Sequence, residues 1–186
     1  MKANQTRNKQ VLRTRQWIFD ALFSLMKTKS LGTISITDVA QRAGVSRQSI
    51  YRNFSCIEEI LIQFFEELFV SFVNNVKNAN INASSKVYIA FFAEFYVNKD
   101  KVLVIQRSGG EDLLIKILWN FQSRFLNPND NTIEKYGKKY QLAGVVGVTV
   151  EWIQSGMNID PDKLGEILEE VTKKLKDETF YLPNSL

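Results

Sequence analysis

Apolar residues recur along most of the chain at the three- and four-residue spacing that places them on one face of a helix. In the segment 11–29, Ile18, Leu22, Leu25 and Met26 share such a face. There is no convincing alternation of apolar and polar residues of the kind that marks a β-strand, and only three prolines interrupt the 186 residues. The pattern therefore predicts an all-α protein.

Breaks in this pattern divide the chain into about nine helices. Glycines at 32, 44, 109, 110 and 156 and the polar runs 78–84 and 127–131 mark the connections. The expected helices span about 11–29, 36–43, 47–54, 56–78, 85–97, 99–107 and 111–126, followed by one that ends near 155 and one over 161–176. The run Ser55-Cys56-Ile57-Glu58 predicts a capping box at the start of the fourth helix. Residues 1–10 are polar and basic, and we expect a flexible arm there.

The segment 36–55 has the residue spacing of a helix-turn-helix, in which two short helices are joined by a tight turn. Ala40 is small where the second helix would cross the first, and Ile50 fills the wedge between the two helices. Gly44 allows the positive φ that the turn needs, and Ser46 can cap the second helix. An ordinary helical hairpin obeys the same packing rules, but here several side-chain constraints and one backbone constraint agree in register.

Charge is unevenly distributed along the chain. Residues 1–55 hold ten Lys and Arg but only two acids, Asp20 and Asp38, so their net charge is +8. The remaining residues hold 14 basic and 18 acidic side chains, a net charge of −4. Such an asymmetry indicates a head that binds a polyanion on a mildly acidic body. Lys2, Arg7 and Lys9 of the arm would add salt-dependent affinity, unless the arm is simply a solvated tail.

The outer side of the second short helix carries side chains suited to duplex DNA. Arg and Gln can make bidentate hydrogen bonds to base edges, and hydroxyl or amide groups suit phosphates or bases. A threonine at the start of the preceding helix could meet a phosphate there. The candidate DNA-binding residues are Thr37, Ser46, Arg47, Gln48, Ser49, Tyr51, Arg52 and Asn53.

These residues resemble the signature of the TetR family of bacterial regulators. The match runs from Ile36 to Phe54, and Glu58-Glu59-Ile60-Leu61 continues it into the fourth helix. The segment from Gly144 to Met157 is similar to the C-terminal region of a subgroup often labelled dihydroxyacetone-kinase-type regulators. The resemblance implies a nine-helix, Ω-shaped homodimer that binds a palindromic operator in double-stranded DNA.

The resemblance also implies roles for the candidate DNA-binding residues. Phosphates would be contacted by Thr37, Tyr51 and Asn53, and base edges by Arg47, Gln48, Ser49 and Arg52. Many members of the family have lysines where this chain has Ser55 and Ile57, and one of those lysines commonly contacts the DNA backbone. We therefore expect the affinity to depend more on the N-terminal arm.

The resemblance divides the chain into two domains, an arm with a three-helix DNA-binding domain over 1–55 and a helical bundle over 56–186 for ligand binding and dimerisation. The helix over about 56–78 connects them. The bundle would enclose a pocket for a small hydrophobic or aromatic effector, although a plain hydrophobic core would contain the same aromatic residues. The candidate pocket residues are Phe65, Phe69, Tyr88, Phe91, Phe92, Phe95, Arg107, Trp119 and Gln122.

The last two helices are the candidates for the homodimer interface. The first of them is apolar on most sides, as expected of a helix buried between its own body and a partner. Gly144 and Gly147 would let another backbone approach closely. The candidate interface residues are Leu142, Val145, Val146, Thr149, Ile153, Leu164, Ile167 and Leu168.

Composition argues against several functional classes. The chain has no histidine and one cysteine, Cys56, which excludes His-based metal sites, Ser-His and Cys-His catalytic pairs and an internal disulfide. P-loop and Rossmann glycine patterns are also missing, so we expect no enzyme, no cofactor and no metal. The single cysteine, together with the lack of a signal-peptide pattern or a membrane-spanning apolar run, leads us to expect a cytoplasmic protein.

Two functions follow from these observations. The first is a transcriptional repressor whose operator affinity is changed by a small hydrophobic or aromatic ligand. The alternative is a TetR-like coactivator or adaptor, in which the C-terminal domain binds a partner protein instead of a small molecule.

Overall fold

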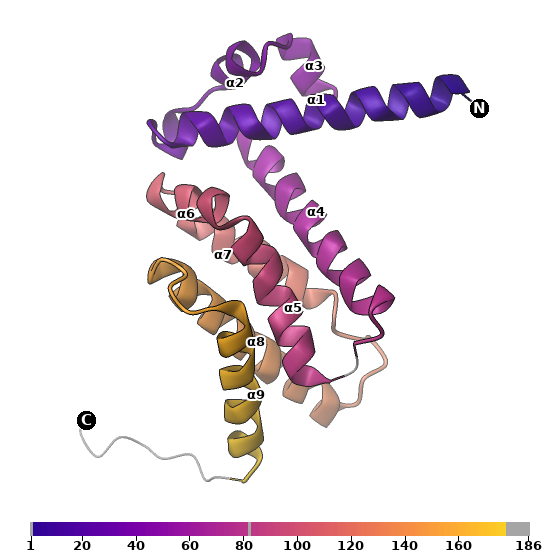
Figure 1. The fold of residues 1–186 in the computed structure, drawn as a ribbon, viewed down its shortest axis with the longest axis vertical. Helices are drawn as coiled ribbons and strands as arrows, with labels where there is room; N and C mark the ends of the chain where they lie inside the picture. Colours follow the sequence, from indigo (N-terminus) through magenta and orange to yellow (C-terminus); the bar gives the residue numbers. More distant parts are fainter. Residues whose placement is uncertain (1, 82, 178–186) are drawn as a thin grey trace. The chain divides into compact units, whose positions relative to one another are not determined.

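The chain folds into α-helices joined by short connections, as a computed structural model shows (Figure 1). The structure describes residues 2–81 and 83–177, with side chains for 11–81, 83 and 85–174. The helices are α1 (Lys2–Met26), α2 (Ile36–Ala43), α3 (Arg47–Tyr51), α4 (Ile57–Asn78), α5 (Ser84–Val97), α6 (Lys99–Arg107), α7 (Glu111–Ser123), α8 (Thr132–Gln154) and α9 (Pro161–Asp177), with a short 3₁₀-helix over Leu31–Thr33. Over these residues the predicted all-α fold of nine helices is confirmed.

Two compact units make up the structure. The first, here called the head unit, contains Met1–Leu68 and Asp100–Leu118, and the second, the body unit, contains Phe69–Lys99 and Trp119–Leu186. The units do not coincide with the domains expected over 1–55 and 56–186, because α6 and most of α7 belong to the head unit. Within the described residues, none of the helices combines the length and apolar character that a membrane-spanning helix needs.

The helix α1 begins earlier than the hydrophobic pattern predicted. Its backbone is helical from Lys2, whereas a flexible arm was expected over 1–10. Ala, Gln, Arg and Lys are good helix formers, which explains how this polar segment extends the helix without an apolar face. Met1 and the side chains of Lys2, Arg7 and Lys9, on which the expectation of DNA contacts by the arm rested, lie outside the described residues.

An aromatic and aliphatic core holds the head unit together. Ile18, Leu22, Ile60 and Leu61 are completely buried, and the ring of Phe64 packs edge-on against that of Phe23 with their centroids 4.8 Å apart. The connection after α1 is tied to the end of α6, because the Leu31 amide donates to the Ser108 carbonyl at 2.8 Å. The head unit therefore has a continuous core that positions α2 and α3.

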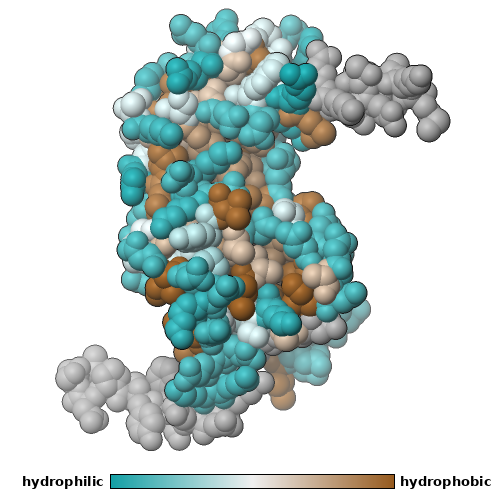
Figure 2. All heavy atoms as spheres, viewed as in Figure 1, coloured by the Kyte–Doolittle hydropathy of each residue, from teal (hydrophilic) through white to brown (hydrophobic). Residues whose placement is uncertain are grey.

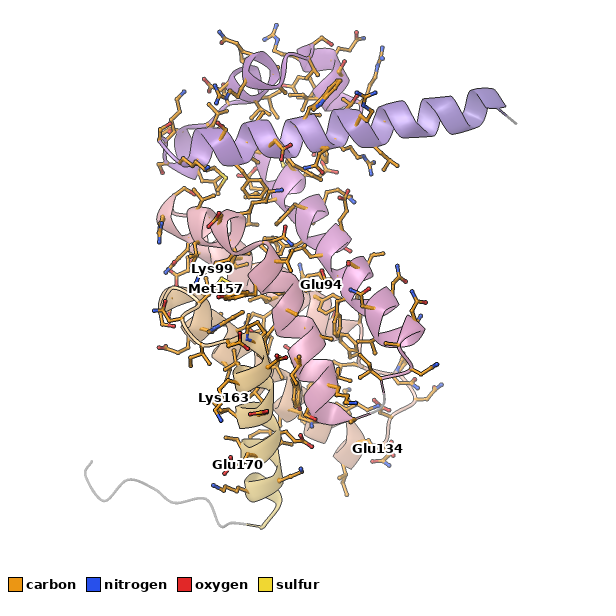
Figure 3. All side chains as sticks on the ribbon, in the orientation of Figure 1. Glu94, Lys99, Glu134, Met157, Lys163 and Glu170 are labelled. Atoms are coloured by element: carbon orange, nitrogen blue, oxygen red, sulfur yellow. The ribbon has the colours of Figure 1, made fainter. Side chains whose placement is uncertain are left out.

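The body unit is built on the close packing of α5 against α9. A Cβ atom added to Gly165 of α9 would lie 2.9 Å from the backbone nitrogen of Ile89, so only glycine fits there. The turn between α8 and α9 contains Gly156 and Met157, both with positive φ. The Nζ of Lys99 donates to the carbonyl of Met157 at 2.8 Å, and both residues are labelled in Figure 3. Gly156 therefore lies in a connection between helices, as the sequence predicted.

Candidate nucleic-acid interface

The turn between α2 and α3 has the geometry that its sequence predicts. Gly44 adopts the left-handed conformation, with φ 67° and ψ 30°. The amide of Val45 donates to the carbonyl of Ala40 at 3.0 Å, and the amide of Gly44 donates to that of Gln41 at 3.3 Å. These two bonds form a Schellman motif, which satisfies carbonyl groups left open at the end of a helix. The chain therefore leaves α2 at a fixed angle and can enter α3 three residues later.

Side-chain caps fix the starts of both short helices. Ser35 and Asp38 form a capping box on α2, in which each side chain accepts a hydrogen bond from the other residue's backbone amide. Ser46, the predicted cap of α3, accepts a hydrogen bond from the amide of Ser49 at 3.1 Å. The box at Ser35 was not predicted, although its Ser-x-x-Asp spacing is visible in the sequence.

The inner faces of α2 and α3 are packed as expected of a helix-turn-helix. Val39 and Ile50 are completely buried, and Ala40 is 4% exposed. Arg42 is used to join helices, since its guanidinium donates to the hydroxyl of Ser24 in α1 at 2.7 Å. This packing leaves the opposite side of α3 to solvent.

The predicted DNA-binding residues are accessible on the head unit. Six are exposed, namely Thr37, Ser46, Arg47, Gln48, Tyr51 and Arg52, and two are half-buried, Ser49 and Asn53. The side chain of Asn53 is held at both ends, because it donates to the Ser49 carbonyl at 2.9 Å and accepts from Nε of Arg15 at 3.5 Å. Arg15 was not identified from the sequence, because its contact depends on the crossing of α1 and α3. Figure 2 shows mostly hydrophilic residues on the visible face of this unit.

Both acids of the segment 1–55 lie close to cations. The Nζ of Lys29 is 2.9 Å from Oδ1 of Asp38, and that of Lys101 is 3.6 Å from Oδ1 of Asp20. Hydrogen bonds from the Ser35 side chain, then from its backbone, and the nearby Lys29 hold the pKa of Asp38 well below its usual range. Each carboxylate therefore has a nearby cation that does not belong to α3. The positive charge of α3 can then attract an anionic partner.

The start of α4 differs in detail from the prediction. The amide and hydroxyl of Ser55 donate to Glu59 at 2.5 and 2.6 Å, so Glu59 takes the role expected of Glu58. These bonds lower the pKa of Glu59. Ile57 is 8% exposed, which makes it a core residue, whereas Ser55 is exposed. Of the two positions where lysines are common in the family, only Ser55 therefore faces solvent in this chain.

The predicted pocket residues are distributed over both units. Phe65 and Arg107 belong to the head unit and the others to the body unit. Phe69 stacks on Phe121 with ring centroids 3.4 Å apart, and Phe91 and Phe95 pack together at 5.0 Å, as in an aromatic core. Phe92 is also buried, Tyr88 is half-buried, Trp119 is 47% exposed, and Gln122 is buried.

A separate cavity lies within the head unit. Its volume is about 810 Å³, and the end of α1 and one side of α6 line it. Lys27, Lys29, Asp100 and Arg107 contribute charged side chains, and Met26 and Leu103 contribute apolar ones. Of the predicted pocket residues only Arg107 lies here. The hydrophobic pattern could not indicate this cavity, because it depends on which residues of α6 meet α1.

Most of the predicted dimer residues are buried within their own chain. Val146, Thr149, Ile153, Leu164 and Leu168 are at most 7% exposed in the single chain. They cannot offer much surface to a partner, so this part of the expectation is revised. Leu142 and Val145 are half-buried, and Ile167 is 37% exposed. Exposed positions on the same helices include Gly144, Gly147 and Val171.

Comparison with known sequences places the helix-turn-helix in a family. Residues 18–64 match the model of the bacterial regulatory proteins of the tetR family. The HTH-type dhaKLM operon transcriptional activator DhaS of Lactococcus lactis is 25% identical over 156 residues, which cover 79% of this chain and 83% of that protein. An uncharacterised HTH-type transcriptional regulator of Haemophilus influenzae is 30% identical over 106 residues, which cover 53% of this chain and 52% of that protein.

Solved structures show the same fold. The dihydroxyacetone kinase operon activator DhaS superposes with a TM-score of 0.58 at 20% identity, over 90% of this chain and 98% of that one. The TetR-family repressor FadR of Thermus thermophilus, in complex with lauroyl-CoA, superposes with a TM-score of 0.52 at 18% identity, over 92% and 98% of the two chains. The similarities to the TetR family and to a dihydroxyacetone-kinase-type regulator that the sequence predicted are confirmed.

Proposed function

We propose that the chain is a transcriptional regulator, a homodimeric repressor that binds a palindromic operator through α3. The match of residues 18–64 to the tetR family model and the similarity to DhaS support this proposal. Each protomer inserts its α3 into the major groove, with Arg47, Gln48, Ser49 and Arg52 at base edges and Thr37, Tyr51 and Asn53 at phosphates. Ser46 fixes the start of α3 and lies next to the DNA. The protein acts in the cytoplasm, where its operator is found.

The main support for this proposal is that α3 has one buried side and one exposed side. Its inner side is anchored by the buried Ile50, and its outer side exposes Arg47, Gln48, Tyr51 and Arg52. An anchored short helix that presents guanidinium and amide groups is suited to hydrogen bonds with base edges, because its orientation is fixed before DNA binds.

The exposed parts of α8 and α9 support the dimer. A Cβ atom added to Gly144 or Gly147 would meet nothing within 4 Å, so another backbone can approach α8 closely there. Ile167 and Val171 add exposed apolar surface on α9, at 37% and 45%. We therefore assign the subunit contact to these exposed positions instead of the buried ones.

Selection from random-sequence duplexes by the full-length protein tests the operator and the dimer together. A homodimer has two identical α3 helices, so the selected sequences are expected to be palindromic, with half-sites one helical turn (about 34 Å) or more apart. A selected sequence with a single half-site would contradict the dimer, and recovery of sequences no different from the starting library would contradict specific binding.

The aromatic residues of the body unit indicate the chemical class of the effector. Regulation requires a ligand with different affinities for the DNA-bound and free states, which would favour one spacing of the two heads. The FadR structure contains an acyl-CoA, and we infer that this chain also responds to a small, largely apolar or aromatic molecule. Loss of operator binding on addition of such a molecule is the expected result.

A second candidate function is favoured by the relative named as an operon activator. In this case the chain would activate transcription as an adaptor, with a protein partner bound to its C-terminal part. Purification of a stable complex that requires body-unit surface residues, together with failure of small molecules to change DNA affinity, would favour this function over the first.

A further inference from the structure

The cavity in the head unit has walls that are tied together at both ends. Near the start of α6, Nζ of Lys101 lies 3.6 Å from Oδ1 of Asp20 in α1. After the end of α6, the carbonyl of Ser108 accepts from the amide of Leu31 at 2.8 Å and from the hydroxyl of Ser30 at 3.3 Å. All lining residues belong to this one compact unit, whose helices α1 and α6 are drawn in Figure 1. The volume of the cavity, about 810 Å³, is in the range of sites for small molecules.

The lining of this cavity combines buried apolar side chains with exposed cations. Met26 and Leu103 form an apolar wall and are only 3% and 7% exposed. Lys27, Lys29 and Arg107 also line the cavity and are exposed. Cations are common at the C-terminal ends of helices, but here they stand beside the apolar wall. This combination suits an organic anion better than an inorganic one, because the apolar part of such a ligand can cover the wall.

The positive charge of the lining is not matched by nearby carboxylates. In the part of the chain that the structure describes, no carboxylate forms an ion pair with Lys27 or Arg107. Asp100, the acid of the lining, is in the first turn of α6. Arg107 is in the last turn, about 10 Å further along the helix axis. The guanidinium of Arg107 is therefore available to an anion in the cavity.

Lys29 links the cavity to the start of the helix-turn-helix. Its Nζ lies 2.9 Å from Oδ1 of Asp38, which forms the capping box of α2. Lys29 also lies at the same end of the cavity as Arg107, because the residues that follow them, Ser30 and Ser108, are joined by a hydrogen bond. An anion bound between Lys29 and Arg107 would therefore compete with Asp38 for the same ammonium group.

We propose that this cavity binds a small organic carboxylate and thereby regulates DNA binding from within the head unit. The carboxylate accepts hydrogen bonds from Arg107 and Lys29, and the apolar part of the ligand covers the wall formed by Met26 and Leu103. Because Lys29 is then drawn from Asp38, the start of α2 is held less firmly. This site is separate from the effector site expected in the body unit, and only its effect on the operator rests on the proposed function.

Three probes test the two parts of the ligand separately: 4-phenylbutyrate, its neutral amide 4-phenylbutanamide, and acetate. In calorimetric titration of the full-length protein, 4-phenylbutyrate is expected to bind about tenfold more tightly than the amide, because only the carboxylate pairs with the cations. It is also expected to bind about tenfold or more tightly than acetate, which leaves the apolar wall uncovered. No binding of 4-phenylbutyrate, or an affinity equal to that of the amide or of acetate, would overturn the proposal.

The substitution Arg107→Gln tests the cation directly. It removes the charge and keeps a polar side chain, so the preference for the carboxylate over the amide is expected to fall by about threefold or more. Lys116→Gln is the matched control, because it removes the same charge from an exposed position of the head unit outside the lining. It should leave the preference unchanged. A preference that persists in Arg107→Gln, or that falls equally in Lys116→Gln, would overturn the assignment.

The substitution Asp38→Asn tests the competition for Lys29. Asp38 does not line the cavity, so its replacement frees the ammonium group of Lys29 without removing a lining residue. The affinity for 4-phenylbutyrate is expected to rise by about twofold to fivefold. Asp112→Asn, which removes another acid of the head unit from an exposed position, is expected to leave this affinity unchanged. An affinity that does not rise in Asp38→Asn would overturn the link to α2.

Operator binding measured on the same preparations separates this site from the proposed function. Saturating 4-phenylbutyrate is expected to weaken operator binding of the wild type by about twofold to fivefold, and acetate at the same concentration is expected to have no effect. Operator binding without binding of any probe would overturn the cavity site and leave the DNA-binding function intact. Binding of 4-phenylbutyrate that leaves operator affinity unchanged would overturn the regulatory role. Binding of the probe by a protein that selects no operator would contradict the proposed function instead.

Discussion

Asp38 joins three neighbouring groups at the start of the helix-turn-helix. Its carboxylate accepts from the amide and hydroxyl of Ser35 at 2.9 and 2.6 Å and lies 2.9 Å from Nζ of Lys29. All three contacts favour the charged form, so the pKa of Asp38 lies below its usual value of 3.8 in the folded chain. Because the folded state holds this proton less tightly than the unfolded state, the contribution of Asp38 to stability is present above about pH 4 and is lost as the pH falls further.

Asp38→Asn is expected to lower the melting temperature at pH 7, where the wild-type carboxylate is ionised. The difference between wild type and variant is expected to narrow below about pH 4, because Asp38 of the unfolded wild-type chain then binds a proton that the folded chain does not yet hold. Thermal unfolding followed by circular dichroism at pH 7 and pH 3 measures this, with Asp112→Asn, an exposed acid of α7, as the charge-matched control. A difference in melting temperature that is the same at pH 7 and pH 3 would show that the charge of Asp38 does not contribute to stability.

For single residues, the sequence predicts those roles that depend only on neighbours in the chain. Gly44 and the cap at Ser46 were predicted, because each depends on neighbours within five residues. Ile57 was considered as a position of DNA contact only because of the family, and its burial depends on how the first turn of α4 meets the core. The contact between Arg15 and Asn53, 38 residues apart, likewise could not be seen in the sequence.

The helix α9 depends on one glycine for its contact with α5. A methyl group at Gly165 would overlap the side chain of Ile89 and lie 2.9 Å from its backbone nitrogen. Backbone atoms cannot move aside as the end of a flexible side chain can. The two helices would therefore have to separate, with loss of packing in the body unit.

Gly165→Ala is expected to destabilise the protein by about 1–3 kcal/mol, the usual cost of overpacking, despite the higher helix propensity of alanine. For a chain of this size the melting temperature would fall by roughly 2–10 °C. Gly137→Ala in α8 is the control, because its added Cβ meets nothing within 4 Å, and it should leave the melting temperature unchanged or raise it. Equal effects of the two substitutions would show that α5 and α9 are not in close contact.

Hydrophobic periodicity predicted the order of the helices but not which of them touch. Gly165 was not singled out from the sequence, although within the chain it lies against the backbone of Ile89. A glycine in a helix can be recognised in the sequence, but its partner helix, here more than seventy residues earlier, cannot. The start of α1 was missed for a related reason, since a polar segment has no apolar face to indicate its helix.

At the scale of the whole molecule, the uneven charge was the most informative property of the sequence. The net charge of +8 over residues 1–55 indicated a polyanion-binding head before any contact was known. The extent of the head unit could not be predicted, because it includes α6 and most of α7, which follow about thirty residues after Leu68. The helix-turn-helix is local in sequence, and the unit that supports it is not.

The central claim is that the outer side of α3 binds operator DNA, and fluorescence anisotropy with a selected operator tests it most directly. The double substitution Arg47→Ala/Tyr51→Ala removes one base-edge and one phosphate contact. It is expected to weaken binding by about 100-fold and to reduce the dependence on salt. Lys163→Ala removes the same single charge from α9 (Figure 3), and it is expected to bind like wild type. Operator affinity that is unchanged by the double substitution, or reduced equally by Lys163→Ala, would contradict the claim.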